Sequence, residues 1–261
     1  MKLGLDDKVA LIAGSSKGLG FATANILLEE GAYVVLNSRS SDSLDQAASS
    51  LGIPERVMTA SGDTTHPEIC KSIVEKVIQN FGRLDILVTN CGGPSAGDFE
   101  NLTDADWDDA ISKSLKSHIY LIRSSLPFLK NSDNASILTI TSFTVKQPLP
   151  NMVLSNSIRA ATAALTKSLS KEFGKYQIRV NSILPGWTYT DRVEDLIKTR
   201  SKASELSIEE ETALISSSIP LGRLGKTEEF AKAAAFLVSP AASFINGVML
   251  NVDGGLYQGL F

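Results

Sequence analysis

The chain has 261 residues, of which 43% are hydrophobic and 21% are charged, and its formal net charge is −4. These proportions are ordinary for a soluble protein with a core, and the length suits one large α/β domain or two small ones. The chain has no basic block or stripe, which argues against nucleic acid or an anionic membrane surface as its main partner.

The cysteines and histidines are too few and too scattered for a zinc site, so no metal is expected. Cys70 falls in a helical pattern and Cys91 among strand-end residues, and both are expected to be buried or half-buried thiols. The first residues are acidic where a signal peptide needs an apolar run, and no stretch approaches the roughly 20 apolar residues of a membrane span. A soluble protein of the reducing cytoplasm is therefore expected.

Short β-branched runs alternate with longer helical patterns along the whole chain. Strands are expected at 9–13, 33–36, 57–60, 84–88, 137–141, 178–184 and 248–252. Helices are expected at 18–30, from about 42 (with Ser41 or Asp42 as the cap), at 66–80, at 107–130 as one long helix, at 155–173, and at 227–238 with Thr227 as the cap. Such alternation predicts a three-layer α/β/α fold with a parallel sheet.

No linker or repeat divides the chain, so a single domain over residues 1–261 is expected. Residues 191–218 are the exception to the strand and helix alternation, because they form a polar, helix-prone excursion after the sixth strand. A segment of this length is more often a lid than a simple connection.

Between the first strand and the first helix lies the stretch A-G-S-S-K-G-L-G, with Gly14, Gly18 and Gly20. Glycine permits a tight turn and a close approach of backbone to a pyrophosphate, which the N–H groups of the helix then bind. Because this loop follows the first strand of an alternating pattern, it predicts a dinucleotide site. The alternative is a glycine loop needed only for packing.

The end of the second strand should meet the ribose 2′ position of the dinucleotide. It carries Asn37, Ser38 and Arg39, with no carboxylate before Asp42. Arg39 is suited to a 2′-phosphate, with Lys17 near enough to assist, which favours NADP(H) over NAD(H). The alternative is that both are solvated surface cations.

With these motifs the chain resembles the short-chain dehydrogenase/reductase family from end to end. The matching stretches are Gly14 to Gly20, Thr89-Asn90-Cys91-Gly92, Asp63 in G-D-T-T, Pro185-Gly186 through Thr190 beside I-R-V-N, the segment I-P-L-G-R, and the tail N-G-V-M-L-N-V-D-G-G. Within the family it is similar to 3-oxoacyl-[acyl-carrier-protein] reductases, some of which share the L-S-N-x-x-R variant. The resemblance implies a Rossmann-type doubly wound sheet of about seven strands, with nicotinamide at the carboxyl ends of the strands.

The resemblance also implies which residues bind the coenzyme and which carry the chemistry. The expected coenzyme residues are Gly14, Ser15, Ser16, Lys17, Gly18, Leu19, Gly20, Ser38, Arg39, Asp63, Thr64, Asn90, Gly92, Arg159, Pro185, Gly186, Thr188 and Thr190. The family's catalytic serine corresponds to Ser142. Its tyrosine, lysine and asparagine correspond to Ser155, Arg159 and Ser114, and no Y-x-x-x-K occurs anywhere in the chain.

These replacements change the chemistry that the site is expected to perform. A serine hydroxyl is a much weaker acid than a phenol, and Arg159 stays charged and cannot shuttle a proton. Arg159 is still suited to holding ribose and stabilising an oxyanion, and Ser155 to a proton relay. Lys146 and Tyr189 are candidate replacement proton donors, with a loop cation and a lid aromatic as the alternatives. His118 is expected to be packed or at a subunit contact.

Three functions remain open. The favoured one is an NADP(H)-dependent oxidoreductase acting on a carbonyl or secondary alcohol (a 3-oxoacyl compound, another ketone or a sugar) through an altered proton path. The second is a dinucleotide-binding sensor or structural partner, with Ser155 and Arg159 vestigial, and the third is elimination or isomerisation on the same fold. The resemblance implies a homotetramer, or otherwise a dimer.

Overall fold

A computed structural model of the chain describes residues 2–260. Within these residues, seven strands form one sheet in the order β3-β2-β1-β4-β5-β6-β7, and every neighbouring pair is parallel. The strands are β1 Val9–Ala13, β2 Tyr33–Asn37, β3 Val57–Thr59, β4 Ile86–Thr89, β5 Ser136–Ile140, β6 Arg179–Pro185 and β7 Met249–Val252. The Rossmann-type doubly wound sheet that the family resemblance implies is thereby confirmed.

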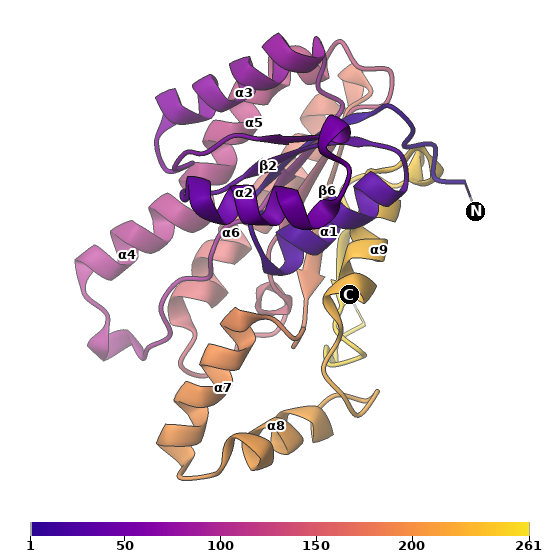
Figure 1. The fold of residues 1–261 in the computed structure, drawn as a ribbon. Helices are drawn as coiled ribbons and strands as arrows, with labels where there is room; N and C mark the ends of the chain where they lie inside the picture. Colours follow the sequence, from indigo (N-terminus) through magenta and orange to yellow (C-terminus); the bar gives the residue numbers. More distant parts are fainter. Residues whose placement is uncertain (1, 261) are drawn as a thin grey trace.

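Helices cover both faces of this sheet (Figure 1). They are α1 Gly18–Glu29, α2 Ser41–Leu51, α3 Pro67–Phe81, α4 Asp104–Ile111, α5 Ser117–Leu129, α6 Val153–Glu172, α7 Asp191–Ser204, α8 Ile208–Ser217 and α9 Thr227–Val238. The helices α1, α2 and α9 contribute to one hydrophobic cluster, and α3 and α5 contribute to the cluster on the opposite face. The helices α7 and α8 lie together at one end of the molecule (Figure 1).

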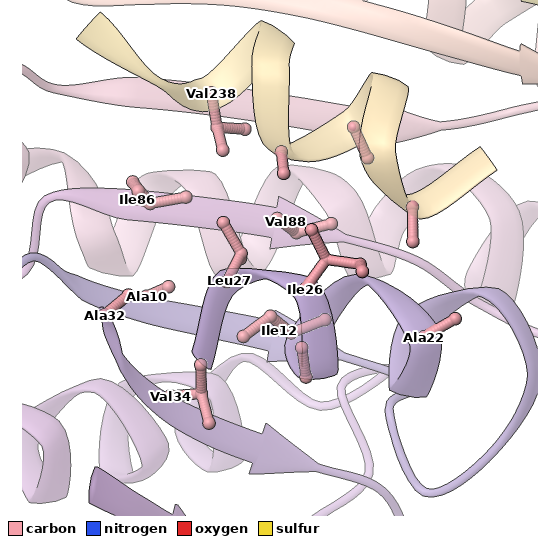
Figure 2. Packing of buried hydrophobic residues seen from close by; sticks show 14 of the residues in the cluster. Ala10, Ile12, Ala22, Ile26, Leu27, Ala32, Val34, Ile86, Val88 and Val238 are labelled. Carbon is pink, nitrogen blue, oxygen red and sulfur yellow. The ribbon is translucent and has the colours of Figure 1, made fainter. Parts of the chain in front are cut away.

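The two cores follow from the alternation of side chains along each strand. In β1, Ala10 and Ile12 belong to the cluster under α1 and α9, whereas Val9 and Leu11 belong to the cluster under α3 and α5. Figure 2 shows the first cluster, where Leu27 of α1 lies over the strands. Because both faces are covered, β1 is apolar throughout, and polar residues of the central strands, such as Thr139 in β5 and Asn181 in β6, are themselves buried.

The sheet order reverses between β1 and β4, since β1 is followed in space by β2 on one side and by β4 on the other. Helices that leave two such strands pass to opposite faces, so a crevice opens at the carboxyl ends of the strands. The topology therefore places any ligand beside the residues that follow β1 and β4.

The helix expected at 107–130 differs from the structure in two ways. It begins at Asp104, because Thr103 and Asp106 form a reciprocal capping box that the hydrophobic pattern did not reveal. It is also interrupted by a π-helical turn at Ser112–Lys116, between α4 and α5. Smaller differences concern caps: Ser40 caps α2 in place of Ser41 or Asp42, and Lys226 is the N-cap of α9 in place of Thr227.

The excursion at 191–218 folds into α7 and α8, which are joined by a buried acid. The Glu211 carboxylate is almost fully buried, and it accepts hydrogen bonds from the Nε of Arg200 at 2.5 Å and from the hydroxyl of Ser204 at 3.1 Å. The apolar contact between the two helices comes from Ile197 and Ile215. The two helices therefore form one packed unit.

In the part of the chain that the structure describes, no helix is both long and apolar enough to cross a membrane. Among the same residues, no group of three histidine, cysteine or acidic side chains is placed to hold a metal ion.

Candidate active site

A cavity of about 530 Å³ opens at the carboxyl ends of β1, β4, β5 and β6. Its wall includes the residues that directly follow these strands, namely Gly14 after β1, Asn90 after β4 and Gly186 after β6. This is the crevice that the reversal of strand order predicts.

The glycine loop forms one wall, and its geometry leaves no room for a side chain at Gly14 or Gly20. A Cβ atom on Gly14, whose φ is 57°, would lie 2.9 Å from the Nδ2 of Asn90, which itself donates to the Gly14 carbonyl at 3.1 Å. A Cβ atom on Gly20 would lie 2.3 Å from the same carbonyl oxygen. No side chain caps the first turn of α1, so its N–H groups and helix dipole remain available to an anion.

The end of β2 forms the cavity wall next to the glycine loop. Asn37 is buried and holds the wall, because its Nδ2 donates to the carbonyls of Ala60 at 2.8 Å and Gly62 at 3.2 Å. Arg39 lines the cavity, is exposed, and forms no ion pair within residues 2–260. It is therefore available to a phosphate group.

Two acids complete this half of the cavity. The pKa of Asp63 is lowered overall. Burial raises it, but hydrogen bonds from the N–H and hydroxyl of Thr65 and the charge of Arg39 together outweigh burial, which keeps the carboxylate ionised. The ammonium of Lys17 lies 2.8 Å from the Asp191 carboxylate. Lys17 thus connects the glycine loop to the start of α7, whereas the sequence predicted that it assists Arg39.

Three residues with hydroxyl groups lie side by side in the cavity wall beyond β5, each in contact with the next. Ser142 follows β5, and its Oγ accepts a hydrogen bond from the N–H of Thr144 at 3.2 Å. The hydroxyl oxygen of Thr144 lies 3.3 Å from that of Ser155 in the first turns of α6. Ser142, Thr144 and Ser155 all line the cavity, and the last two are nearly inaccessible to bulk solvent.

Two arginines lie beside these hydroxyls. Arg159 comes one helical turn after Ser155, is 8% exposed, and donates a hydrogen bond to the carbonyl of Thr141, the residue before Ser142. Arg192 enters from α7 and donates from Nη2 to the carbonyl of Pro94 at 2.8 Å. Both guanidinium groups line the cavity.

The π-helical turn places Ser114 behind the wall and not in the cavity. The Ser114 carbonyl accepts a hydrogen bond from the hydroxyl of Thr162 at 2.5 Å, three residues after Arg159 on α6. The turn is therefore tied to α6, the helix that carries Ser155 and Arg159. Such turns often occur at functional sites.

His118 is buried behind the same wall, as expected for a packed residue. Its Nδ1 lies 2.6 Å from the hydroxyl of Thr89, and its Nε2 lies 3.7 Å from the Sγ of Cys91. Burial lowers the pKa of His118 to about 3, and the charge of Arg159 lowers it in the same direction. The imidazole is therefore neutral at physiological pH and is not an imidazolium acid. Cys91 is half-buried and Cys70 is buried, as predicted.

Most of the residues predicted from the sequence come together in this one cavity. Its wall contains Gly14, Ser16, Lys17, Gly18, Leu19, Ser38, Arg39, Asp63, Thr64, Asn90, Gly92, Ser142, Ser155, Arg159, Pro185, Gly186, Thr188 and Thr190. Three predicted residues lie behind the wall: Ser15, Gly20 and Ser114. Ser15 is buried, and its hydroxyl donates to the carbonyl of Ile12 at 2.7 Å, so it shapes the loop from behind.

Neither candidate replacement for the proton donor lines the cavity. The ammonium of Lys146 lies over the ring of Tyr257, 5.3 Å from its centre, and the side chain of Tyr189 is 61% exposed. Sequence reasoning missed Thr144 and Arg192. Thr144 is two residues after Ser142 and could have been found from that spacing, but Arg192 reaches the cavity only through the position of α7.

Comparison with known proteins extends these observations. The model of the family described as enoyl-(acyl carrier protein) reductase matches residues 13–257. A 3-oxoacyl-[acyl-carrier-protein] reductase of Thermotoga maritima is 34% identical over 97% of this chain and 98% of that protein.

Two solved structures are similar over nearly the whole length. The L-sorbose reductase of Gluconobacter frateurii, complexed with NADPH and L-sorbose, has a TM-score of 0.94 and 32% identity, and the match covers 100% of both chains. An NADPH-bound short-chain oxidoreductase of Pseudomonas aeruginosa PAO1, described as containing an atypical catalytic center, has a TM-score of 0.89 and 32% identity, over 97% of this chain and 99% of that one.

Proposed function

Because the chain belongs to the short-chain dehydrogenase/reductase family of oxidoreductases that act on CH–OH groups, we propose that it transfers hydride between NADP(H) and a small ketone or secondary alcohol. A 3-oxoacyl compound and a ketose sugar are the substrate classes that its relatives suggest. The observation that carries the proposal is that Ser142 and Arg159 line the same cavity as the glycine loop.

The residues present fit a nicotinamide dinucleotide. The glycine loop presents bare backbone and the uncapped start of α1, which suit a pyrophosphate. Arg39 is an unpaired planar cation at the end of β2, where a 2′-phosphate would distinguish NADP(H) from NAD(H). NADPH-bound relatives support the same preference. When bound, the coenzyme supplies or accepts the hydride.

The chain's own groups handle the substrate oxygen. The Ser142 Oγ already accepts from the Thr144 N–H, so its proton remains free to donate to a carbonyl oxygen. Arg159 brings a positive charge that stabilises negative charge on that oxygen in a site of low dielectric. The paired hydroxyls of Thr144 and Ser155 then offer a route by which a proton reaches the oxygen from water.

The missing tyrosine lowers the rate without abolishing it. Loss of a positioned general acid costs a factor of about 10²–10⁴. Holding the hydride donor beside its acceptor is equivalent to effective concentrations of roughly 10⁵–10⁸ M, and this contribution needs only the binding sites. Slow but measurable turnover is the expected outcome.

The test is oxidation of NADPH by the purified protein with a panel of ketones, β-ketoacyl thioesters and ketoses. The proposal requires turnover that depends on Ser142, so Ser142→Ala should lower it at least tenfold while NADPH affinity stays the same. Tight NADPH binding without turnover of any substrate would count against an enzyme.

The second candidate is a nucleotide-binding sensor or structural partner. It is favoured by the lining of the cavity, which within residues 2–260 contains no tyrosine or histidine, and whose two acids, Asp63 and Asp191, we assign to the coenzyme. It predicts NADPH binding and indifference to Ser142→Ala. For either function we propose a homotetramer, which light scattering of the purified chain would test.

A further inference from the structure

The guanidinium groups of Arg159 and Arg192 converge on one corner of the cavity, beside Gly93. A Cβ atom on Gly93 would lie 3.7 Å from the Nη2 of Arg159 and 3.4 Å from both the Nε and the Nη2 of Arg192. The first arginine comes from α6 and the second from α7, so two separate elements bring positive charge to the same place.

Neither charge is neutralised by the protein. The acceptors of Arg159 and Arg192 are the backbone carbonyls of Thr141 and Pro94, and neither guanidinium pairs with a carboxylate among residues 2–260. By contrast, the ammonium of Lys113 in the same wall lies 2.7 Å from the Asp109 carboxylate.

The two like charges act on each other. Partial removal from water lowers the pKa of Arg192, and the charge of Arg159 lowers it further, although Asp195 opposes this shift. Two cations in a site of reduced dielectric repel each other, and an anion bound between them removes that cost. A planar carboxylate is suited to the role, because it accepts paired hydrogen bonds from guanidinium groups.

We propose that the substrate carries a carboxylate which binds between Arg159 and Arg192, so that the substrate class is a short oxo acid or the corresponding hydroxy acid. The inference rests on the proposed oxidoreductase function. The carboxylate site is next to the reacting centre, because Arg159 holds the carbonyl of Thr141 and Ser142 is the next residue. The inference requires that a carbonyl one or two carbons from the carboxylate reaches the Ser142 hydroxyl.

The coenzyme supplies the hydride of the chemical step, and water supplies the proton. In the reducing direction the carbonyl carbon gains hydride from NADPH, the C=O π bond breaks, and the oxygen gains a proton delivered from water through the hydroxyls. The products are the hydroxy acid, NADP⁺ and the hydroxide ion that water leaves when it gives up the proton. No further reactant is required.

The first experiment compares pyruvate, 2-oxobutyrate and acetoacetate with their methyl esters as oxidants of NADPH. The wild-type protein should prefer the acids. Arg192→Gln should raise KM for the acids by about 10–100-fold, the range for a lost hydrogen bond to a charged group, while KM for the esters and the affinity for NADPH stay the same. Lys202→Gln is the matched control, since it removes an exposed charge from the same helix α7.

Two results would overturn the inference while the oxidoreductase function survives. One is equal use of acids and esters by the wild-type protein. The other is a loss of NADPH affinity in Arg192→Gln, which would assign this arginine to the diphosphate of the coenzyme.

A binding measurement separates the inference from the proposed function. Oxalate is titrated calorimetrically into the protein saturated with NADP⁺, and this needs no turnover. Binding that is lost in Arg192→Gln and retained in Lys202→Gln supports the carboxylate site even if no ketone is reduced. Absence of oxalate binding to the wild-type protein would overturn it.

Discussion

The hydroxyl oxygens of Ser155 and Thr144 lie 3.3 Å apart in the wall of the cavity, one from α6 and the other from the turn after β5. The N–H of Thr144 also reaches the Oγ of Ser142. Thr144 therefore connects Ser155 with Ser142, the serine that we propose faces the substrate. It is a positioning residue for both.

Changing Ser155 to tyrosine together with Arg159→Lys should restore the family's proton donor. Because residue 155 lines the cavity, the phenol has open space in front of it. NADPH oxidation should rise by up to about 10²–10⁴, the usual contribution of a positioned acid. Steady-state rates with the best substrate of the panel measure this, with Ser155→Ala as the control. An unchanged rate would mean that proton supply is not what limits turnover.

Arg39→Ala should weaken NADPH binding selectively. The guanidinium is the unpaired cation at the end of β2, and hydrogen bonds to a charged phosphate are worth about 1.5–3 kcal/mol, or about 10–100-fold in affinity. NADH lacks the 2′-phosphate, so its affinity serves as the internal control in the same fluorescence titration. Equal affinity of the wild-type protein for both coenzymes would contradict the proposed preference.

His118 should make the fold sensitive to acid. Its pKa is about 3 in the folded chain and about 6.5 in an unfolded one. Because the folded pKa is depressed, the unfolded state binds the extra proton between these values, so stability falls as the pH drops through this window. Between about pH 7 and pH 4.5 this group alone should cost about 2–3 kcal/mol.

The variant His118→Gln checks that assignment, because an amide does not titrate. Urea unfolding at the two pH values should show a smaller loss of stability in the variant than in the wild-type chain. An identical loss in both would assign the acid sensitivity to other groups.

Glu211→Gln should loosen the connection between α7 and α8. The carboxylate is buried and accepts from Arg200 and Ser204, so its replacement weakens a charged hydrogen bond by about 1–3 kcal/mol. Limited proteolysis should cut within residues 191–218 faster in the variant, while the sheet remains folded by circular dichroism. Glu209→Gln, on the exposed side of α8, is the matched control.

Local signals were sufficient for the fold and for most of the residues that line the glycine-loop side of the cavity. The strand and helix periods depend on which side chains face a core. Gly20 is required by the nearby carbonyl of Gly14, and Gly14 is required by Asn90 at the end of the adjacent strand β4. Such constraints act between near neighbours or repeat along the chain, so they are visible in the sequence. The loss of the tyrosine and lysine was visible for the same reason.

Only the tertiary structure decided which residues lie next to Ser155 and Arg159. Thr144 meets Ser155, and Arg192 meets Arg159, through the packing of elements that the sequence does not place relative to one another. The π-helical turn is likewise tied to Thr162, which is distant in the sequence from Ser114, by the hydrogen bond that the Thr162 hydroxyl donates to the Ser114 carbonyl. Contacts of this kind are set by how whole helices dock on the sheet. No local pattern of residues records that geometry.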